Sequence, residues 1–128
     1  MKINKIHHVA ILTDRYEESK RFYTDLLGFT IINETYREQR DSYKLDLAIN
    51  GQYCIELFSF PEYKERNTFP ESKGLRHLAF AVDDVEKWID FLRTKNVNVQ
   101  DVRIDEITLK KFTFFYDPNG QPLELYEE

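Results

Sequence analysis

The chain carries one pattern twice, and this repeat limits its possible folds more than any other feature. His8 precedes Val-Ala-Ile and His77 precedes Leu-Ala-Phe, so the two histidines stand 77 − 8 = 69 residues apart. Glu56 and Glu124, each between two branched aliphatic residues, stand 124 − 56 = 68 residues apart. Because a histidine and a glutamate recur in nearly one register, the sequence predicts two halves of equivalent structure.

Each half is predicted to fold as βαβββ. Alternating and β-branched runs predict strands at about 5–12, 30–36, 44–49 and 52–58 in the first half, and at about 75–82, 97–101, 112–116 and 122–126 in the second. Asn50-Gly51 in the first half and Asp117-Pro118-Asn119-Gly120 in the second are typical of tight turns between strands.

A helix is expected after the first strand of each half. Asp14 and Asp83, each three residues before a glutamate, are the expected N-caps, and Gly28 is the expected left-handed end of the first helix. The predicted fold class is therefore α+β, built from two βαβββ modules. We expect a single domain over residues 1–128, with modules at about 4–60 and 75–127 and a polar linker at about 61–74.

The composition excludes several classes of function. Hydrophobic residues make up 41% of the chain, including ten Phe and eight Tyr, which is enough for a sizeable core. The net charge of −5 argues against a nucleic-acid partner. No apolar run is long enough to span a membrane, no signal-peptide pattern is present, and the single Cys54 rules out an internal disulfide. We expect a cytoplasmic protein that acts on a small molecule, with no nucleic-acid and no membrane partner.

Strand alternation gives His8 and His77 a particular environment. Side chains two apart share a face, so each histidine lies beside small alanines, while the bulkier residues face the helix. Glu56 and Glu124 likewise point away from their aliphatic neighbours. A carboxylate that faces an interior is costly unless it is paired or bound to a cation. Two imidazoles and two carboxylates suit a divalent transition metal, so His8, Glu56, His77 and Glu124 are the predicted metal ligands.

The sequence resembles the vicinal oxygen chelate superfamily, in particular its glyoxalase I-like branch and the short bacterial YaeR-type proteins related to glyoxalases and bleomycin-resistance proteins. The resemblance covers nearly the whole chain. Its most specific motifs are His8-Val9-Ala10-Ile11, Phe22-Tyr23-Thr24-Asp25-Leu26-Leu27-Gly28-Phe29, Arg76-His77-Leu78-Ala79-Phe80, and Asp117-Pro118-Asn119-Gly120 followed by Leu123-Glu124-Leu125.

The resemblance implies a metal-dependent lyase or isomerase. The four predicted ligands fall on the family's metal positions, and Glu at position 56 resembles glyoxalase I rather than the extradiol dioxygenases or epimerases. One Ni(II), Zn(II) or Co(II) ion per site is implied. The reaction implied moves a proton within an α-oxo-aldehyde–thiol adduct or a similar vicinal-oxygen molecule, with Glu124 or Glu56 as the base. Relatives are frequently homodimers, and either one chain or two can supply each metal site.

One departure from the glyoxalase pattern concerns the cosubstrate. Relatives commonly carry an arginine where this chain has Leu12, and that arginine helps to hold glutathione, so another thiol cosubstrate stays open. Two alternatives remain: another enzyme of the superfamily, such as a fosfomycin-type thiol transferase or an epimerase, and a non-catalytic small-molecule binding or resistance protein. The candidate substrate-binding residues are Arg37, Lys44, Phe58, Lys111, Phe114 and Tyr126.

Overall fold

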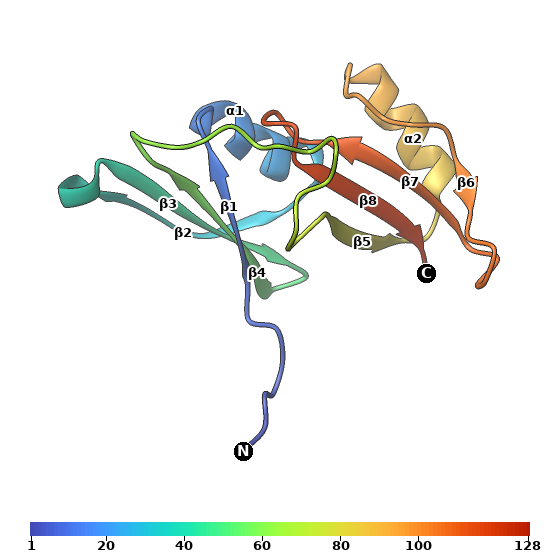
Figure 1. Cartoon of the computed structure of the whole chain (residues 1–128), viewed down its shortest axis with the longest axis horizontal. Coiled ribbons are helices and arrows are strands. Elements are labelled where there is room, and N and C mark those ends of the chain that lie inside the picture. Colours follow the sequence, from blue (N-terminus) through green and yellow to red (C-terminus); the bar gives the residue numbers. More distant parts are fainter. The chain divides into compact units, whose positions relative to one another are not determined.

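Each half of the repeat forms a four-stranded sheet with one α-helix packed against it (Figure 1). The computed structural model describes residues 1–128, which form two units, Met1–Lys64 and Glu65–Glu128. The first unit contains β1 (Val9–Thr13), α1 (Tyr16–Arg21), the π-helix η1 (Phe22–Leu26), β2 (Thr30–Arg37), the 3₁₀ helix η2 (Glu38–Arg40), β3 (Ser42–Ile49) and β4 (Gln52–Ser59). The second contains β5 (Leu78–Val82), α2 (Val85–Thr94), β6 (Arg103–Ile104), β7 (Lys111–Tyr116) and β8 (Pro122–Glu127).

The two sheets have the same topology. Their strand orders are β1-β4-β3-β2 and β5-β8-β7-β6, and only the first pair of each sheet is parallel. In the parallel pairs, Ala10 lies opposite Glu56 and Ala79 lies opposite Glu124. The predicted α+β class and the two equivalent βαβββ halves are therefore confirmed, and the structure adds that the strands with the two glutamates have the same register in both halves.

The core of the first unit lies between its sheet and its helices. Leu45 and Leu47 of β3 and Ile55 and Leu57 of β4 are almost completely buried, and α1 packs on β4. Because side chains alternate along a strand, the residues between them face the other side of the sheet, and Glu56 is among them. The second unit repeats this plan, with Leu123 and Leu125 buried on the face that α2 covers.

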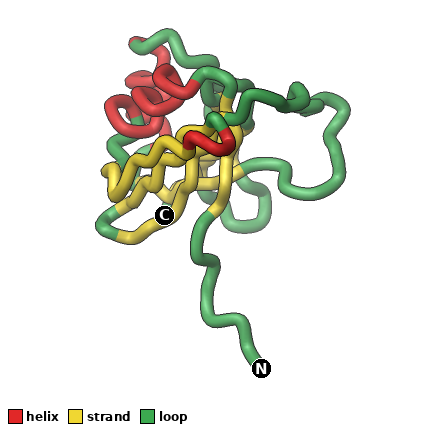
Figure 2. Tube along the Cα trace, turned by 90° about the vertical axis from the view of Figure 1, so that its left-hand side faces the viewer, coloured by secondary structure: helices red, strands yellow, loops and turns green.

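Both histidines lie at the start of a strand rather than inside one. The parallel ladders begin at Val9 and Leu78, so His8 and His77 each stand one residue before the first paired position. The predicted strands at 5–12 and 75–82 are therefore too long at their N-terminal ends. The residues before β1 form a loop, as does the segment between β4 and β5 (Figure 2).

Both predicted helix caps are wrong by a small shift. Helix α1 begins at Tyr16 without a side-chain cap, and the Thr13 hydroxyl, not Asp14, accepts the Arg15 N–H at 2.9 Å. In α2 the cap is Asp84, whose carboxylate accepts the Lys87 N–H at 3.0 Å. Where several polar residues stand in a row, only the path of the chain out of the strand decides which one caps the helix.

The predicted strand at 97–101 is also wrong. Only Val99 forms an isolated bridge there, and the paired strand is β6, which lies opposite Phe112 and Lys111. The Thr113 hydroxyl donates to the carbonyl of Gln100 at 2.8 Å. The Gln100 N–H donates to the carbonyl of Phe114 at 2.9 Å, so backbone and side-chain bonds together hold this segment on β7 without a regular ladder.

The predicted turns are confirmed. Asn50 and Gly51 have φ values of 50° and 77°, the left-handed pair that a tight hairpin requires. The Asp117 carboxylate accepts the backbone N–H groups of Asn119 and Gln121, which closes the second turn. Gly28 ends η1 with a φ of 82°, as expected. None of the helices is long and apolar enough to cross a membrane.

Candidate metal and substrate site

Each unit holds one of the predicted histidines against one of the predicted glutamates. In the first unit, His8 Nε2 lies 2.7 Å from Glu56 Oε2. The other ring nitrogen, Nδ1, lies 2.9 Å from Nδ1 of His7, and the ring of Tyr53 packs 5.3 Å from the His8 ring centroid. The imidazole is therefore oriented with Nε2 toward the carboxylate.

The second unit contains the equivalent pair. His77 Nε2 lies 3.0 Å from Glu124 Oε2, and the His77 ring meets Phe114 edge to face at a centroid distance of 5.0 Å. Nδ1 of His77 is buried without a hydrogen-bond partner. Both units thus present the same two atoms, an imidazole Nε2 and a carboxylate Oε2, close together.

The spacing within each pair suits two neighbouring ligands of one metal ion. With bonds of about 2.1 Å at about 90°, such ligand atoms lie about 3 Å apart. The observed nitrogen–oxygen distances are 2.7 and 3.0 Å. Each unit offers two donors, and the structure gathers no group of three or more His, Cys, Asp or Glu side chains that could hold a metal ion.

The surroundings of the two glutamates differ. Beside Glu56, Lys44 Nζ lies 3.6 Å from Glu56 Oε1 and 3.1 Å from Asp46 Oδ1. Tyr53 donates to Asp46 at 2.7 Å, and burial together with this hydrogen bond raises the pKa of the Tyr53 hydroxyl well above its usual range. Asp46 and Tyr53 were not predicted as site residues. The alternation of Lys44 and Asp46 with buried leucines is the sequence signal that could have indicated them.

In the second unit, the neighbours of Glu124 are aromatic rather than charged. Phe114 lies opposite Glu124 in the ladder, as Asp46 lies opposite Glu56. The guanidinium of Arg103 stacks over Phe114 at 5.2 Å from the ring centroid. Glu124 therefore has His77 as its only ion-pair partner, whereas Glu56 also has a lysine.

The remaining predicted substrate residues are placed as follows. The Arg37 guanidinium stacks over Phe58 at 4.7 Å and donates to the Ser42 hydroxyl at 3.0 Å. The Tyr126 hydroxyl donates to Asp105 at 3.0 Å. Lys111 pairs with Glu86 of α2 at 2.7 Å, so it lies on the helix side of the sheet, opposite the face of Glu124, and we leave it out of the site. Leu12 is 41% exposed.

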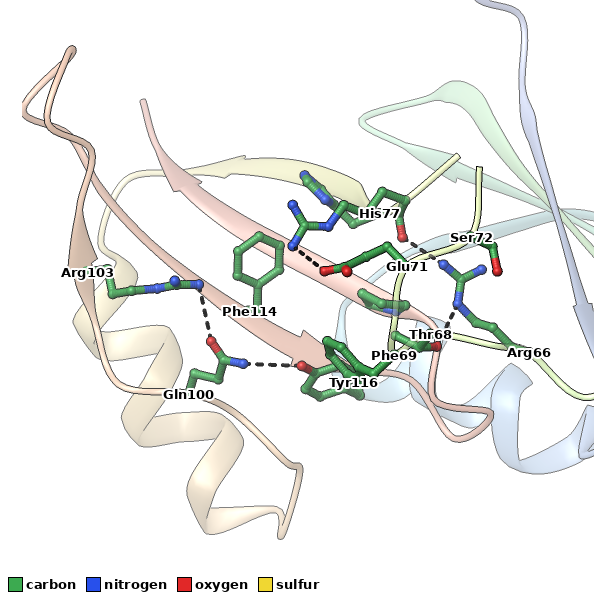
Figure 3. A pocket seen from close by; sticks show the side chains of 12 residues that line it. Arg66, Thr68, Phe69, Glu71, Ser72, His77, Gln100, Arg103, Phe114 and Tyr116 are labelled. Atoms are coloured by element: carbon green, nitrogen blue, oxygen red, sulfur yellow. Dashed lines mark hydrogen bonds and ion pairs between the residues drawn. The ribbon is translucent and has the colours of Figure 1, made fainter. Parts of the chain in front are cut away.

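A pocket of about 180 Å³ lies in the second unit, and His77 forms part of its wall (Figure 3). Phe114 and Tyr116 of β7 supply an aromatic surface. Arg103 and Gln100 line it from the segment before β7, and Arg66 lines it from the segment before β5. Of these residues only His77 and Phe114 were predicted, because Gln100 and Arg103 fall where the sequence predicted an ordinary strand and a loop.

Comparison with known proteins identifies the family. Residues 5–125 match the Glyoxalase/Bleomycin resistance protein/Dioxygenase superfamily. The chain is 56% identical to YaeR of Escherichia coli over 98% of both chains, and 55% identical to YwkD of Bacillus subtilis over the full length of both. The crystal structure of a glyoxalase family protein from Enterococcus faecalis is similar, with a TM-score of 0.90 and 42% identity over 99% of this chain and 100% of that one.

More distant relatives have named activities. The chain is 25% identical to a lactoylglutathione lyase of Schizosaccharomyces pombe, over all of this chain and 49% of that protein. It is 27% identical to the metallothiol transferase FosB of Staphylococcus epidermidis, over 98% of this chain and 83% of that protein. The chain belongs to the Glyoxalase/Bleomycin resistance protein/Dioxygenase superfamily.

Proposed function

From membership of this superfamily, we propose that the chain is a metal-dependent lyase or isomerase of the glyoxalase I type. His8, Glu56, His77 and Glu124 together would hold one divalent ion, Ni(II), Zn(II) or Co(II). The substrate would be a small molecule with oxygen atoms on adjacent carbons, such as the adduct of an α-oxo-aldehyde with a thiol.

One observation carries this proposal: a His–Glu pair recurs at equivalent places in both units. Each pair has its glutamate opposite an alanine in a parallel ladder and its nitrogen–oxygen distance near 3 Å. A ligand set of two imidazoles and two carboxylates requires both copies. Since one pair alone offers two donors, both pairs are needed for four ligands. The similarity to a lactoylglutathione lyase also supports the proposal.

The contacts favour Glu124 over Glu56 as the group that moves the proton. A bound divalent ion would stabilise the negative charge that develops on a substrate oxygen when the neighbouring carbon loses its proton. Lys44 Nζ, 3.6 Å from Glu56 Oε1, pairs with that carboxylate and restricts its movement, so Glu56 is the poorer proton carrier. Glu124 has no lysine or arginine beside it and can take the proton from one carbon and return it to the next.

Metal content and isomerase activity test the proposal together. After loading with Ni(II) or Zn(II), the purified protein is expected to retain about one ion per four-ligand site and to isomerise the hemithioacetal of methylglyoxal. His77→Ala should lose the metal, whereas Glu124→Gln should lose activity by a factor of about 10² or more. Glu106→Gln, at an exposed glutamate, is the matched control and should change neither. A protein that takes up no metal would overturn the proposal.

The similarity to FosB supports a second candidate, a thiol transferase. Glutathione and bacillithiol are therefore both tested, first as adducts with methylglyoxal and then as free thiols with fosfomycin. Turnover of fosfomycin without isomerase activity would identify the transferase. If the metal-loaded protein binds these small molecules and turns over none of them, it is a binding protein.

A further inference from the structure

The pocket of the second unit has a charge opposite to that of the whole chain. Its lining includes Arg66, Arg76 and Arg103 but only one acidic residue, Glu71, so these side chains carry a net charge of +2. The chain as a whole carries −5. Arg76 is paired with Glu71 at 3.2 Å, whereas Arg66 and Arg103 have no carboxylate partner. Two positive charges are therefore left to face the pocket.

The polar groups at one end of the pocket are arranged as donors. Arg103 donates to the side-chain oxygen of Gln100 at 3.2 Å, and the amide nitrogen of Gln100 donates to the Tyr116 hydroxyl oxygen at 3.2 Å (Figure 3). The side-chain oxygen of Gln100 is thus already occupied as an acceptor, and the two hydrogen bonds of Gln100 hold the side chains of Arg103 and Tyr116 in position. The Tyr116 O–H and the other N–H groups of Arg103 stay free to donate, and this suits a ligand that only accepts hydrogen bonds.

An aromatic surface joins this end to the metal-binding histidine. The centroid of the Phe114 ring lies 5.2 Å from the Arg103 guanidinium carbon and 5.0 Å from the His77 ring centroid. The guanidinium and the imidazole therefore lie within about two ring widths of each other, on either side of the Phe114 centroid. A flat molecule lying on Phe114 could contact Arg103 at one end and reach toward His77 at the other.

The volume limits the size of the ligand. A cavity of about 150 Å³ in another protein accepts benzene. This pocket, at about 180 Å³, has room for a ring of that size carrying one small substituent.

We infer that this pocket binds a small, flat organic carboxylate, with the carboxylate on Arg103 and the Tyr116 hydroxyl and the body of the molecule against Phe114. The direction of the ligand, with its far end at His77, rests on the proposed function. The binding itself requires no metal. The inference therefore names the substrate class of the proposed site, and it can be tested independently of the proposed function.

Three probes separate charge from shape. Benzoate is flat and anionic, benzamide is flat and neutral, and cyclohexanecarboxylate is anionic and puckered. Each is titrated into the full chain, freed of metal with a chelator, and binding is followed by calorimetry and by the amide NMR signals of Phe114 and Tyr116. Benzoate should bind about tenfold or more tightly than benzamide, because only the negatively charged carboxylate forms an ion pair with the guanidinium as well as accepting its hydrogen bonds. It should also bind more tightly than cyclohexanecarboxylate.

The variants locate the carboxylate. Arg103→Gln should weaken benzoate binding about tenfold or more and leave benzamide unchanged, and Tyr116→Phe should weaken benzoate binding by a smaller factor. Arg93→Gln is the control, because Arg93 pairs with Asp101 and does not line the pocket. Equal affinities for benzoate and benzamide, or benzoate binding that survives both pocket variants, would overturn the inference. If Arg103→Gln fails to fold, the affinities of Tyr116→Phe for benzoate and for benzamide decide the question.

The two proposals fail separately. If the protein binds benzoate but takes up no metal, the inference about the pocket stands and the proposed isomerase function is refuted. If the protein takes up metal and isomerises the hemithioacetal but binds benzoate no better than benzamide, the proposed function stands and the inference about the pocket is refuted.

Discussion

Replacing Lys44 by methionine tests how the first unit keeps a predicted metal ligand in place. Lys44 Nζ lies 3.1 Å from Asp46 and 3.6 Å from Glu56. The two carboxylates stand directly opposite each other on neighbouring strands, and both are buried. Without the lysine, two negative charges would face each other with no Lys or Arg beside them.

The expected loss of stability follows from these distances. With an effective dielectric constant of about 20, each of the two attractions is worth about 5 kcal/mol before desolvation is subtracted. Removing one partner of a buried pair costs about 3–5 kcal/mol. Lys44 is 30% exposed, which lowers this figure. We expect Lys44→Met to lower the free energy of unfolding by about 2 kcal/mol, equivalent to about 7 °C in Tm for a chain of this length.

Urea unfolding of the chelator-treated protein measures this loss. The matched control is Lys87→Met, because Lys87 also lies 3.6 Å from a carboxylate but is 86% exposed, and its loss should cost less than about 0.5 kcal/mol. A divalent ion bound at Glu56 would replace the missing charge, so Ni(II) should stabilise Lys44→Met more than the unchanged protein. If Lys44→Met and Lys87→Met unfold alike, the reasoning about Lys44 is refuted. If Ni(II) shifts Lys44→Met and the unchanged protein equally, Glu56 is not at the metal.

Three further predictions concern stability. Asp84→Ala should cost about 1 kcal/mol, because the carboxylate caps α2, whereas Asp83→Ala should cost almost nothing in the same urea titration. Lys20, with help from a tyrosine hydroxyl, holds the pKa of the Glu34 carboxyl below its usual value. Glu34 therefore stabilises the fold above about pH 4.3 and loses this effect as the pH falls through its lowered folded pKa, so the stability difference from Glu34→Gln should shrink steadily as the pH is lowered below about 4.3. Leu92→Ala should cost about 2–5 kcal/mol in thermal or urea unfolding, because this leucine of α2 is completely buried; a smaller loss would mean that α2 contributes little to its unit.

The sequence by itself determined the plan of each half. The doubled His–Glu pattern predicted two equivalent units, and alternation along β4 and β8 placed Glu56 and Glu124 on the face away from the buried leucines. These features are local, because side-chain direction in a strand depends only on position along it. The left-handed turn at Asn50-Gly51 was predicted for the same reason.

Only the tertiary structure decided which groups surround the two glutamates. Asp46 lies opposite Glu56 and Phe114 lies opposite Glu124, and these partners are set by strand register, which a single strand does not contain. The segment 97–101 meets β7 only through the Val99 bridge and the bonds of Gln100, and Arg103, in the short strand that follows, lies over Phe114. The charged surroundings of one pair and the aromatic pocket of the other therefore come from contacts between residues far apart in the chain.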